Sequence, residues 1–266
     1  MPALELETMR CEVEGPLGRL RLNRPDALNA ANWAWVRDLV TATAYLEQQT
    51  SLHVVLVSGE GRAFCSGLDV KELATGALTP DWFATWERGV LALANLPAIT
   101  LAAVQGYCLG GGLQVAIACD LVVAASDAVM SIPAVREGVV AALGPMRLAR
   151  QIGAAPAKRL CLLGHRFGAE EGQRLGLVAE VVPPERLEAR ALEIAGELLE
   201  IPFPALLHTK RQIDHAFDMS PADLCTEMVA AQENCLASPE HAAVMVRYRA
   251  EQAAKQQART EASQQT

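Results

Sequence analysis

Short apolar segments recur along the first two thirds of the chain, and polar or glycine-containing stretches separate them. Unbroken apolar runs of this length are typical of strands that are buried on both faces of a sheet. Between them, apolar residues recur at the spacing of a helix. The pattern predicts strands over residues 9–13, 17–22, 53–57, 97–105, 121–125 and 177–182, and helices over 30–49, 81–95, 113–119, 146–152, 157–163 and 169–175. This order of elements indicates an α/β fold, and its opening sequence of two strands, a helix and a strand suggests a spiral of ββα turns.

After Pro184 the apolar spacing is entirely helical, and it predicts helices over residues 185–199, 203–217, 221–237 and 239–257. The last residues of the chain are polar and are expected to be disordered. We therefore expect three parts: a core over residues 1–200, a helical region over 201–257 and a polar tail over 258–266.

Charge and composition exclude several classes of protein. The net charge of −8 argues against a nucleic-acid partner, which usually requires a basic stripe. No apolar run approaches the length of a membrane span, and residues 1–30 show no signal segment. The seven cysteines are odd in number and lack the paired spacing of metal ligands, so reduced thiols and a cytoplasmic location are expected, with no metal.

Three consecutive glycines, Gly110 to Gly112, lie between the strand expected over 97–105 and the helix expected over 113–119. Glycine lets a backbone approach a ligand closely, and the first N–H groups of a helix have no partner within the helix. A helix N-terminus also favours negative charge. The segment is therefore a candidate site for an oxyanion or a phosphate, although a flexible turn would explain the glycines equally well.

A second segment, residues 53–70, has the same organisation: a strand, a tight loop of small residues and the next element. Two such loops can direct two backbone N–H groups at one point. This arrangement is the geometry of an oxyanion hole.

Three ordered motifs in these segments resemble those of the crotonase (enoyl-CoA hydratase/isomerase) superfamily, and the resemblance extends from about Leu20 to about Val182. The motifs are Leu22-Asn23-Arg24-Pro25 through Leu28-Asn29-Ala30, Phe64-Cys65-Ser66-Gly67-Leu68-Asp69, and Gly106 through Asp120 with its glycine triplet and terminal Cys-Asp. The resemblance implies a crotonase-like ββα spiral followed by a helical oligomerisation region, assembled as a homotrimer or as two stacked trimers. The final helix nevertheless lacks the family's usual Glu-Gly and Phe-x-x-Lys-Arg sequence.

By the same resemblance, the backbone N–H groups of Leu68 and Gly111 bind the thioester carbonyl of an acyl-CoA, and no cofactor is needed beyond the CoA moiety of the substrate. Asp69 is expected to cap and fix its loop, and Tyr107 to form a wall of the pocket. The segment 71–97 is expected to shape the acyl pocket, although ordinary helix packing would also explain its aromatic residues. The positions expected at the bound acyl-CoA are Arg24, Ala27 and Leu28 on the adenine side, with Arg24 near the phosphates, and then Ser66, Gly67, Leu68, Asp69, Tyr107, Gly110, Gly111, Gln114, Pro133 and Ala134.

The chain departs from the family at the positions that perform hydration. A hydratase of this family adds water with two glutamates, and here those positions hold Gln114 and Ala134. A glutamine can hydrogen-bond a water molecule but cannot exchange a proton with it, and alanine can do neither. The usual hydratase pair is therefore absent.

One carboxylate remains nearby, because Glu137 lies three residues after Ala134. If this segment is helical, the two side chains share nearly the same face. A single base can remove a proton and return it, which is what a double-bond isomerase needs. The alternative is a surface glutamate paired with Arg136 or Arg147.

The sequence thus predicts an enoyl-CoA hydratase/isomerase-like enzyme with Leu68, Gly111 and Glu137 at its catalytic centre, and favours isomerase chemistry over hydration. A non-catalytic acyl-CoA-binding protein remains an alternative, as does another crotonase reaction such as thioester hydrolysis or decarboxylation. Cys65 is a conceivable nucleophile, but a small packing residue is the preferred interpretation.

Overall fold

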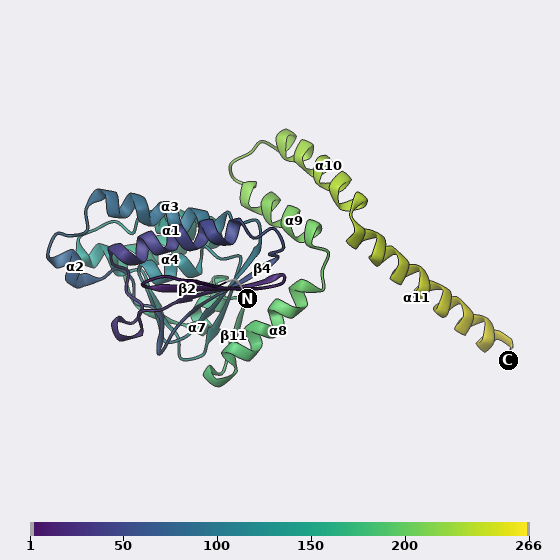
Figure 1. The fold of residues 1–266 in the computed structure, drawn as a ribbon, viewed down its shortest axis with the longest axis horizontal. Helices are drawn as coiled ribbons and strands as arrows, with labels where there is room; N and C mark the ends of the chain where they lie inside the picture. The colour runs from purple at the N-terminus through teal and green to yellow at the C-terminus, as the bar shows by residue number, and fades with distance from the viewer. Residues whose placement is uncertain (1–2, 265–266) are drawn as a thin grey trace. The chain divides into compact units, whose positions relative to one another are not determined.

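The computed structural model of the chain describes residues 3–264, with side chains through residue 258. The chain divides after Leu199 into two compact units. The first unit contains two sheets and most of the helices, and the second contains helices α9, α10 and α11 (Figure 1).

The first unit is built on a seven-stranded sheet. The two pairings among its first three strands are antiparallel, and all the later pairings are parallel. The strand order is β1 (Ala3–Glu5), β2 (Met9–Glu14), β3 (Leu17–Leu22), β4 (Val54–Gly59), β6 (Ile99–Val104), β8 (Leu121–Ala125) and β11 (Glu180–Val182). The predicted strands at these positions are confirmed, with small shifts at their ends.

Both faces of this sheet are covered, which explains the unbroken apolar runs. Along β4, Val55 and Val57 pack in the core beneath α1 (Trp33–Glu47) and α3 (Pro80–Ala94). Leu56, between them, packs in a second core against α8 (Leu187–Leu199). Figure 1 shows α1 and α3 on one side of the sheet and α8 on the other.

A second sheet of four short strands was not predicted. Its order is β10 (Phe167–Gly168), β9 (Val129–Ser131), β7 (Tyr107–Leu109) and β5 (Ala63–Cys65). The strands β4, β6 and β8 of the large sheet are followed directly by β5, β7 and β9 of the small one, and each pair is followed by helix: α2 (Val70–Ala74) with α3, α4 (Gly111–Ala116), and α5 (Gly144–Ile152) with α6 (Ala154–Leu163). The expected spiral of ββα turns is therefore present.

Short helical turns complete the first unit, and they also set where the long helices begin. α1 was expected from Ala30 but begins at Trp33, because Leu28 and Asn29 have left-handed backbone angles and Asn32 caps the helix by accepting a hydrogen bond from the Trp35 N–H. The remaining elements are the 3-10 helices η1 (Pro25–Ala27), η2 (Pro133–Glu137) and η3 (Pro184–Arg186), and α7 (Ala169–Leu175).

The second unit consists of α9 (Phe203–His215), α10 (Pro221–Ala237) and α11 (Pro239–Gln264). Ser220 caps the start of α10, because its side chain accepts a hydrogen bond from the Asp223 N–H. α11 continues through residues 258–264, which the sequence predicted to be disordered, and the rest of that predicted tail lies outside the described residues. None of the helices described is both long enough and apolar enough to cross a membrane.

Candidate active site

A small pocket of about 50 Å³ lies where the loop after β5, the start of α4, helix α3 and the 3-10 helix η2 meet. Polypeptide segments far apart in the sequence therefore converge on one point. Nine of the residues that the sequence assigned to the site line it: Ser66, Gly67, Leu68, Gly110, Gly111, Gln114, Pro133, Ala134 and Glu137.

Backbone hydrogen bonds fix the loop on both sides of Leu68. The Ala31 N–H donates to the Gly67 carbonyl at 2.8 Å, and the Asp69 N–H donates to the Ala31 carbonyl at 2.8 Å. These bonds use the groups that flank Leu68. Within residues 3–264, the N–H of Leu68 itself has no protein acceptor, so it is available to a ligand.

The glycine triplet holds the second donor. Gly110 has φ 52° and ψ −111°, a conformation open essentially only to glycine, and its N–H donates to the Ser131 carbonyl at 2.8 Å. Gly111 follows as the first residue of α4, where an N–H has no intrahelical acceptor. A Cβ atom built on Gly67 would lie 3.4 Å from the Gly111 nitrogen, so the two loops are in close contact. The pair of N–H groups suits a carbonyl oxygen that gains negative charge.

Stacked tryptophans from α1 and α3 form one side of the pocket. The Trp86 ring stacks on Trp35 with centroids 5.2 Å apart and on Trp82 with centroids 5.6 Å apart. Trp82 and Trp86 line the pocket, and each is 2% exposed. A Cβ atom on Gly111 would come within 2.6 Å of the Trp86 ring, so the indole lies directly against the glycine triplet. This aromatic wall requires glycine at position 111.

Gln114 is buried at the pocket, on the first turns of α4. Its Oε1 has no hydrogen-bond partner among the described residues. A buried acceptor without a partner is costly, and a bound ligand or water that donates a hydrogen bond would remove that cost. The side chain can therefore orient a bound molecule, but it cannot titrate.

Glu137 is the only ionisable side chain among the residues that line the pocket. It ends the 3-10 helix η2, in which residues three apart are eclipsed, so its side chain follows that of the buried Ala134. The residue is exposed overall, yet partial burial of its carboxyl raises its pKa. A carboxylate in these surroundings is suited to accept a proton.

The alternative partners considered for Glu137 are engaged elsewhere. The Arg136 Nε donates to the Leu163 carbonyl at 2.7 Å. Arg147 forms an ion pair with Glu87 at 2.8 Å. No ion pair of Glu137 with either arginine is found among the described side chains.

Comparison with known proteins identifies the family. A family model described as enoyl-CoA hydratase/isomerase matches residues 12–254. The chain belongs to the enoyl-CoA hydratase/isomerase family. The Mycobacterium bovis protein named probable enoyl-CoA hydratase echA8 is 37% identical to it over 80% of this chain and 84% of the relative.

Solved structures agree with the family assignment and confirm the crotonase fold. The enoyl-CoA hydratase of Bacillus anthracis has a TM-score of 0.86 at 25% identity, covering 92% of this chain and 97% of the other. A Thermobifida fusca YX protein, solved in complex with acetoacetyl-CoA, has a TM-score of 0.79 at 26% identity and covers 86% and 95%.

The residues expected on the CoA side of this enoyl-CoA hydratase/isomerase family site are not part of the pocket lining. They are Arg24, Ala27 and Leu28, and Asp69 of the pocket loop does not line the pocket either. They lie on segments joined to the pocket loop, since the Ser66 N–H donates to the Leu28 carbonyl at 3.0 Å. Arg24 contacts Asp69 at 3.4 Å and donates to the Ala30 carbonyl, while Asp69 caps α2 through the Lys71 N–H at 3.1 Å. Asp69 therefore fixes the loop, as expected.

Tyr107 was expected to form a wall of the pocket, but it is not among the residues that line the pocket. The residue lies on β7 and is 36% exposed. Its ring instead has the Arg166 guanidinium 5.9 Å from its centroid. The neighbouring side chain of Cys108 points into the core, so alternation along the strand turns Tyr107 away.

Cys65 is a packing residue. Burial raises the pKa of its thiol to about 12, and the Sγ donates to the Asn29 carbonyl at 3.1 Å. A thiol in this state is no nucleophile near neutral pH. Across the described part of the chain, no cluster of His, Cys, Asp and Glu is arranged to hold a metal ion.

Sequence reasoning did not single out the remaining lining residues, although the resemblance to the family led us to expect the segment 71–97 to shape the acyl pocket. Trp82 and Trp86 are spaced four residues apart on α3, a signal for one helix face that ordinary packing explains equally well. The segment 140–142 gave no signal, because its position next to the pocket depends on the turn between η2 and α5. The lining residues that were not assigned individually are Val70, Trp82, Phe83, Trp86, Val140, Ala141 and Ala142.

Proposed function

We propose that this enoyl-CoA hydratase/isomerase family member binds an acyl-CoA thioester and stabilises its enolate. The N–H groups of Leu68 and Gly111 would bind the thioester oxygen, and Glu137 would act as the base. The observation that carries the proposal is the meeting of two unpaired N–H groups and one carboxylate at one pocket. The Thermobifida fusca relative, solved with acetoacetyl-CoA, supports the choice of ligand class. No cofactor beyond the CoA moiety is required.

The reaction that fits this set of groups best is double-bond isomerisation. Glu137 would remove a proton from Cα of a 3-enoyl thioester, and the negative charge would develop on the carbonyl oxygen between the two N–H groups. The protonated carboxyl would then return the proton at Cγ, giving the 2-enoyl thioester. Hydration is disfavoured because Gln114 and Ala134 cannot transfer protons.

The exchange of substrate protons with solvent tests this mechanism. In deuterium oxide, wild-type protein should incorporate deuterium into the acyl group of a suitable acyl-CoA, measured by mass spectrometry. Glu137→Gln should lower this exchange by about 10²–10⁴-fold, the usual contribution of a positioned acid or base. Affinity for acyl-CoA should change little, because glutamine is nearly isosteric and the carbonyl contacts come from the backbone.

A matched control is Glu188→Gln on the exposed face of α8, which should exchange as the wild type does. If exchange by Glu137→Gln equals that of the wild type, Glu137 is not the base. If no acyl-CoA binds at all, the proposed function is wrong as a whole.

A second candidate is a non-catalytic acyl-CoA-binding protein. The presence of Gln114 and Ala134 at the two hydratase positions favours it, because the chain then retains the oxyanion hole without the acid–base pair. This candidate predicts tight binding of acyl-CoA and no deuterium incorporation by wild-type protein. The experiment above therefore separates the two functions.

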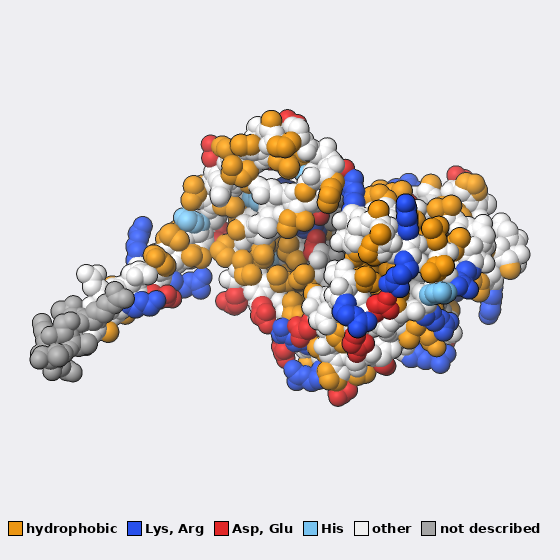
Figure 2. Space-filling view, turned by 180° about the vertical axis from the view of Figure 1, so that it is seen from behind, with side chains coloured by type: hydrophobic (Ala, Val, Ile, Leu, Met, Phe, Trp, Pro, Cys, Tyr) orange, Lys and Arg blue, Asp and Glu red, His pale blue; other side chains and the backbone are white. Residues whose placement is uncertain are grey.

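We further propose that the chain assembles into a homotrimer or a pair of stacked trimers through its helical unit. Large apolar side chains are exposed in this unit, among them Phe217 at 70% in the turn after α9 and Val246 at 65% on α11. Figure 2 shows hydrophobic side chains at the surface of the molecule. Exposed apolar surface of this kind usually marks an interface. Sedimentation equilibrium should give three or six times the chain mass of 28.5 kDa, and a monomer at micromolar concentration would contradict the proposal.

A further inference from the structure

Polar atoms without hydrogen-bond partners are concentrated at the candidate active site. Among the described side chains, five buried polar atoms lack a partner. Three of them belong to residues that line the active-site pocket: the indole Nε1 atoms of Trp82 and Trp86, and the amide Oε1 of Gln114. A buried polar group without a partner is costly, and folded proteins contain few of them. Their concentration at one pocket indicates that a polar group of a ligand belongs there.

The Gln114 amide is held next to the oxyanion hole. Gln114 follows Gly111 by three residues on α4, so the two residues share nearly the same face of the helix. The side chain is 4% exposed. A Cβ atom on Gly144, the first residue of α5, would come within 2.9 Å of its Cγ and Cδ, so α5 packs directly against the amide. The first carbons after a carbonyl bound at Gly111 would therefore lie beside Gln114.

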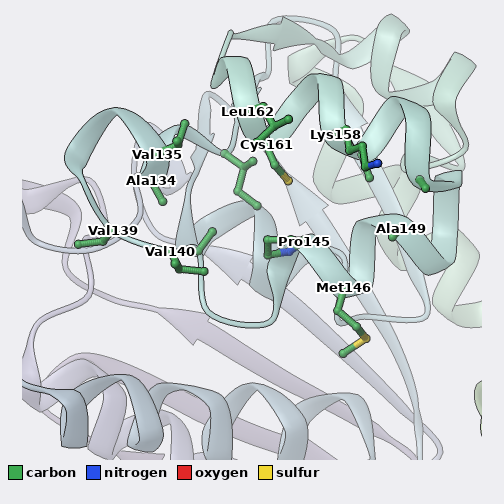
Figure 3. A pocket seen from close by; sticks show the side chains of 14 residues that line it. Ala134, Val135, Val139, Val140, Pro145, Met146, Ala149, Lys158, Cys161 and Leu162 are labelled. Atoms are coloured by element: carbon green, nitrogen blue, oxygen red, sulfur yellow. The ribbon is translucent and has the colours of Figure 1, made fainter.

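The space next to the pocket has a different character. Figure 3 shows a neighbouring cavity of about 490 Å³, whose lining is apolar except for Lys158. Ala134, Val140 and Ala141 line both spaces. The three unpaired polar atoms all belong to residues of the pocket, and none of these residues lines the cavity. A polar group close to the thioester is therefore better matched than one further along a ligand.

A hydroxyl group matches both kinds of unpaired atom, because it can donate to an amide oxygen and accept from an indole N–H. The pocket volume of about 50 Å³ is sufficient for a group of this size, since one molecule in liquid water has a share of about 30 Å³. A methyl group can neither donate nor accept. If water fills the free pocket, a hydroxyl can replace its hydrogen bonds, whereas a methyl group that displaces the water cannot.

We propose that the site selects acyl-CoA thioesters that carry a hydroxyl group close to the thioester carbonyl, and that Gln114 determines this specificity by accepting the hydrogen bond. The inference rests on the proposed function, since it assumes that a thioester is held at Leu68 and Gly111. The hydroxyl is a group for recognition that stays on the acyl chain. It is not the product of water addition, because Gln114 cannot transfer a proton.

Titration calorimetry with matched pairs of thioesters, in which a hydroxyl replaces a methyl group of similar size, tests the proposal. Two pairs carry the hydroxyl near the carbonyl: 3-hydroxybutanoyl-CoA with 3-methylbutanoyl-CoA, and 4-hydroxybutanoyl-CoA with pentanoyl-CoA. In at least one of them the hydroxy member should bind wild-type protein roughly 5- to 100-fold more tightly, because the methyl member leaves a buried acceptor unpaired. In a third pair, 6-hydroxyhexanoyl-CoA with heptanoyl-CoA, the hydroxyl lies beyond Gln114 and the gain should be absent.

Replacement of Gln114 should remove this preference. Gln114→Met keeps the length of the side chain without the amide, so the two members of each pair should bind it with equal affinity. Gln114→Leu provides a second apolar replacement in case the first variant fails to fold. The matched control is Gln173→Met on α7, where the glutamine is exposed and does not line the pocket. This control should retain the preference of the wild type.

The outcomes separate this inference from the proposed function. If wild-type protein binds both members of every pair equally, the inference is wrong although the proposed function stands. If the preference survives both replacements of Gln114, or is equally large in the 6-hydroxyhexanoyl pair, another group recognises the hydroxyl and the inference is also wrong. If no thioester binds at all, the proposed function itself fails.

Discussion

The ion pair between Glu87 and Arg147 connects α3, which forms one side of the candidate active site, with α5, which begins just after the lining segment 140–142. Glu87 is on α3, directly after the pocket residue Trp86, and Arg147 is on α5. The carboxylate accepts from the guanidinium at 2.8 and 3.3 Å and from the Leu143 N–H at 2.7 Å. The side chains of Arg147 and Glu87 are only 8% and 15% exposed. We therefore predict that this pair supports both stability and the shape of the pocket.

Replacement of Glu87 by alanine would leave the Arg147 charge buried without its partner and the Leu143 N–H without its acceptor. Removal of one member of a buried pair typically costs about 3–5 kcal/mol. At roughly 2–4 °C per kcal/mol for a chain of this size, Tm should fall by roughly 6–20 °C. The loss should be larger than for any exposed pair, because little solvent can replace the carboxylate.

Urea denaturation and scanning calorimetry, at one fixed protein concentration, measure this loss. The control is Glu171→Ala, which breaks the exposed pair with Arg159 at 2.6 Å, where the side chains are 31% and 49% exposed. An exposed pair contributes about 0–1 kcal/mol, so this variant should differ little from the wild type. If the two variants lose the same small amount of stability, our reasoning about burial of the Glu87 pair is wrong.

Three further predictions concern the chemistry of the site. Gly111→Ala should force a shift of the Trp86 ring, since the new Cβ would come within 2.6 Å of it, and should slow deuterium exchange by about 10²–10³-fold, as expected for a displaced oxyanion donor. Hydration of crotonyl-CoA should be feeble in the wild type and should rise in the double variant Gln114→Glu, Ala134→Glu; efficient hydration by the wild type would contradict the assignment of missing acid–base groups. Exchange should rise with pH through the pKa of Glu137, because only the carboxylate form is a base and burial raises that pKa above its usual range, so a pH-independent rate would exclude the residue.

The parallel strands of the large sheet were predictable because burial on both faces makes them continuous apolar runs. Residues 55–57 on β4 alternate between two cores, so all three positions must be apolar. The small sheet escaped prediction because β5, β7 and β9 have three residues each. A segment this short shows no periodicity, and its pairing depends on contacts distant in the sequence.

The candidate site was partly predictable for a similar reason. Leu68 and Gly111 belong to motifs whose glycines leave a local signature, and Glu137 is three residues from Ala134, which is the repeat of the 3-10 helix that forms there. For the aromatic wall, the resemblance to the family indicated only the segment 71–97. The spacing of its tryptophans could not decide, because a tryptophan in the core and a tryptophan beside a ligand have the same helical spacing. The outward orientation of Tyr107 depended on β7, which the sequence did not reveal.

The stack of Trp35, Trp86 and Trp82 also provides an intrinsic fluorescence signal near the candidate active site. It holds three of the four tryptophans in the chain. The ring centroids are 5.2 and 5.6 Å apart, so excitation energy passes readily between neighbouring indoles. A change in the surroundings of one ring should therefore alter the fluorescence emission of the whole stack. Because Trp86 lies against Gly111, a thioester bound there would touch the emitting group. Fluorescence of the unlabelled protein can therefore follow arrival of a ligand at the oxyanion hole in real time.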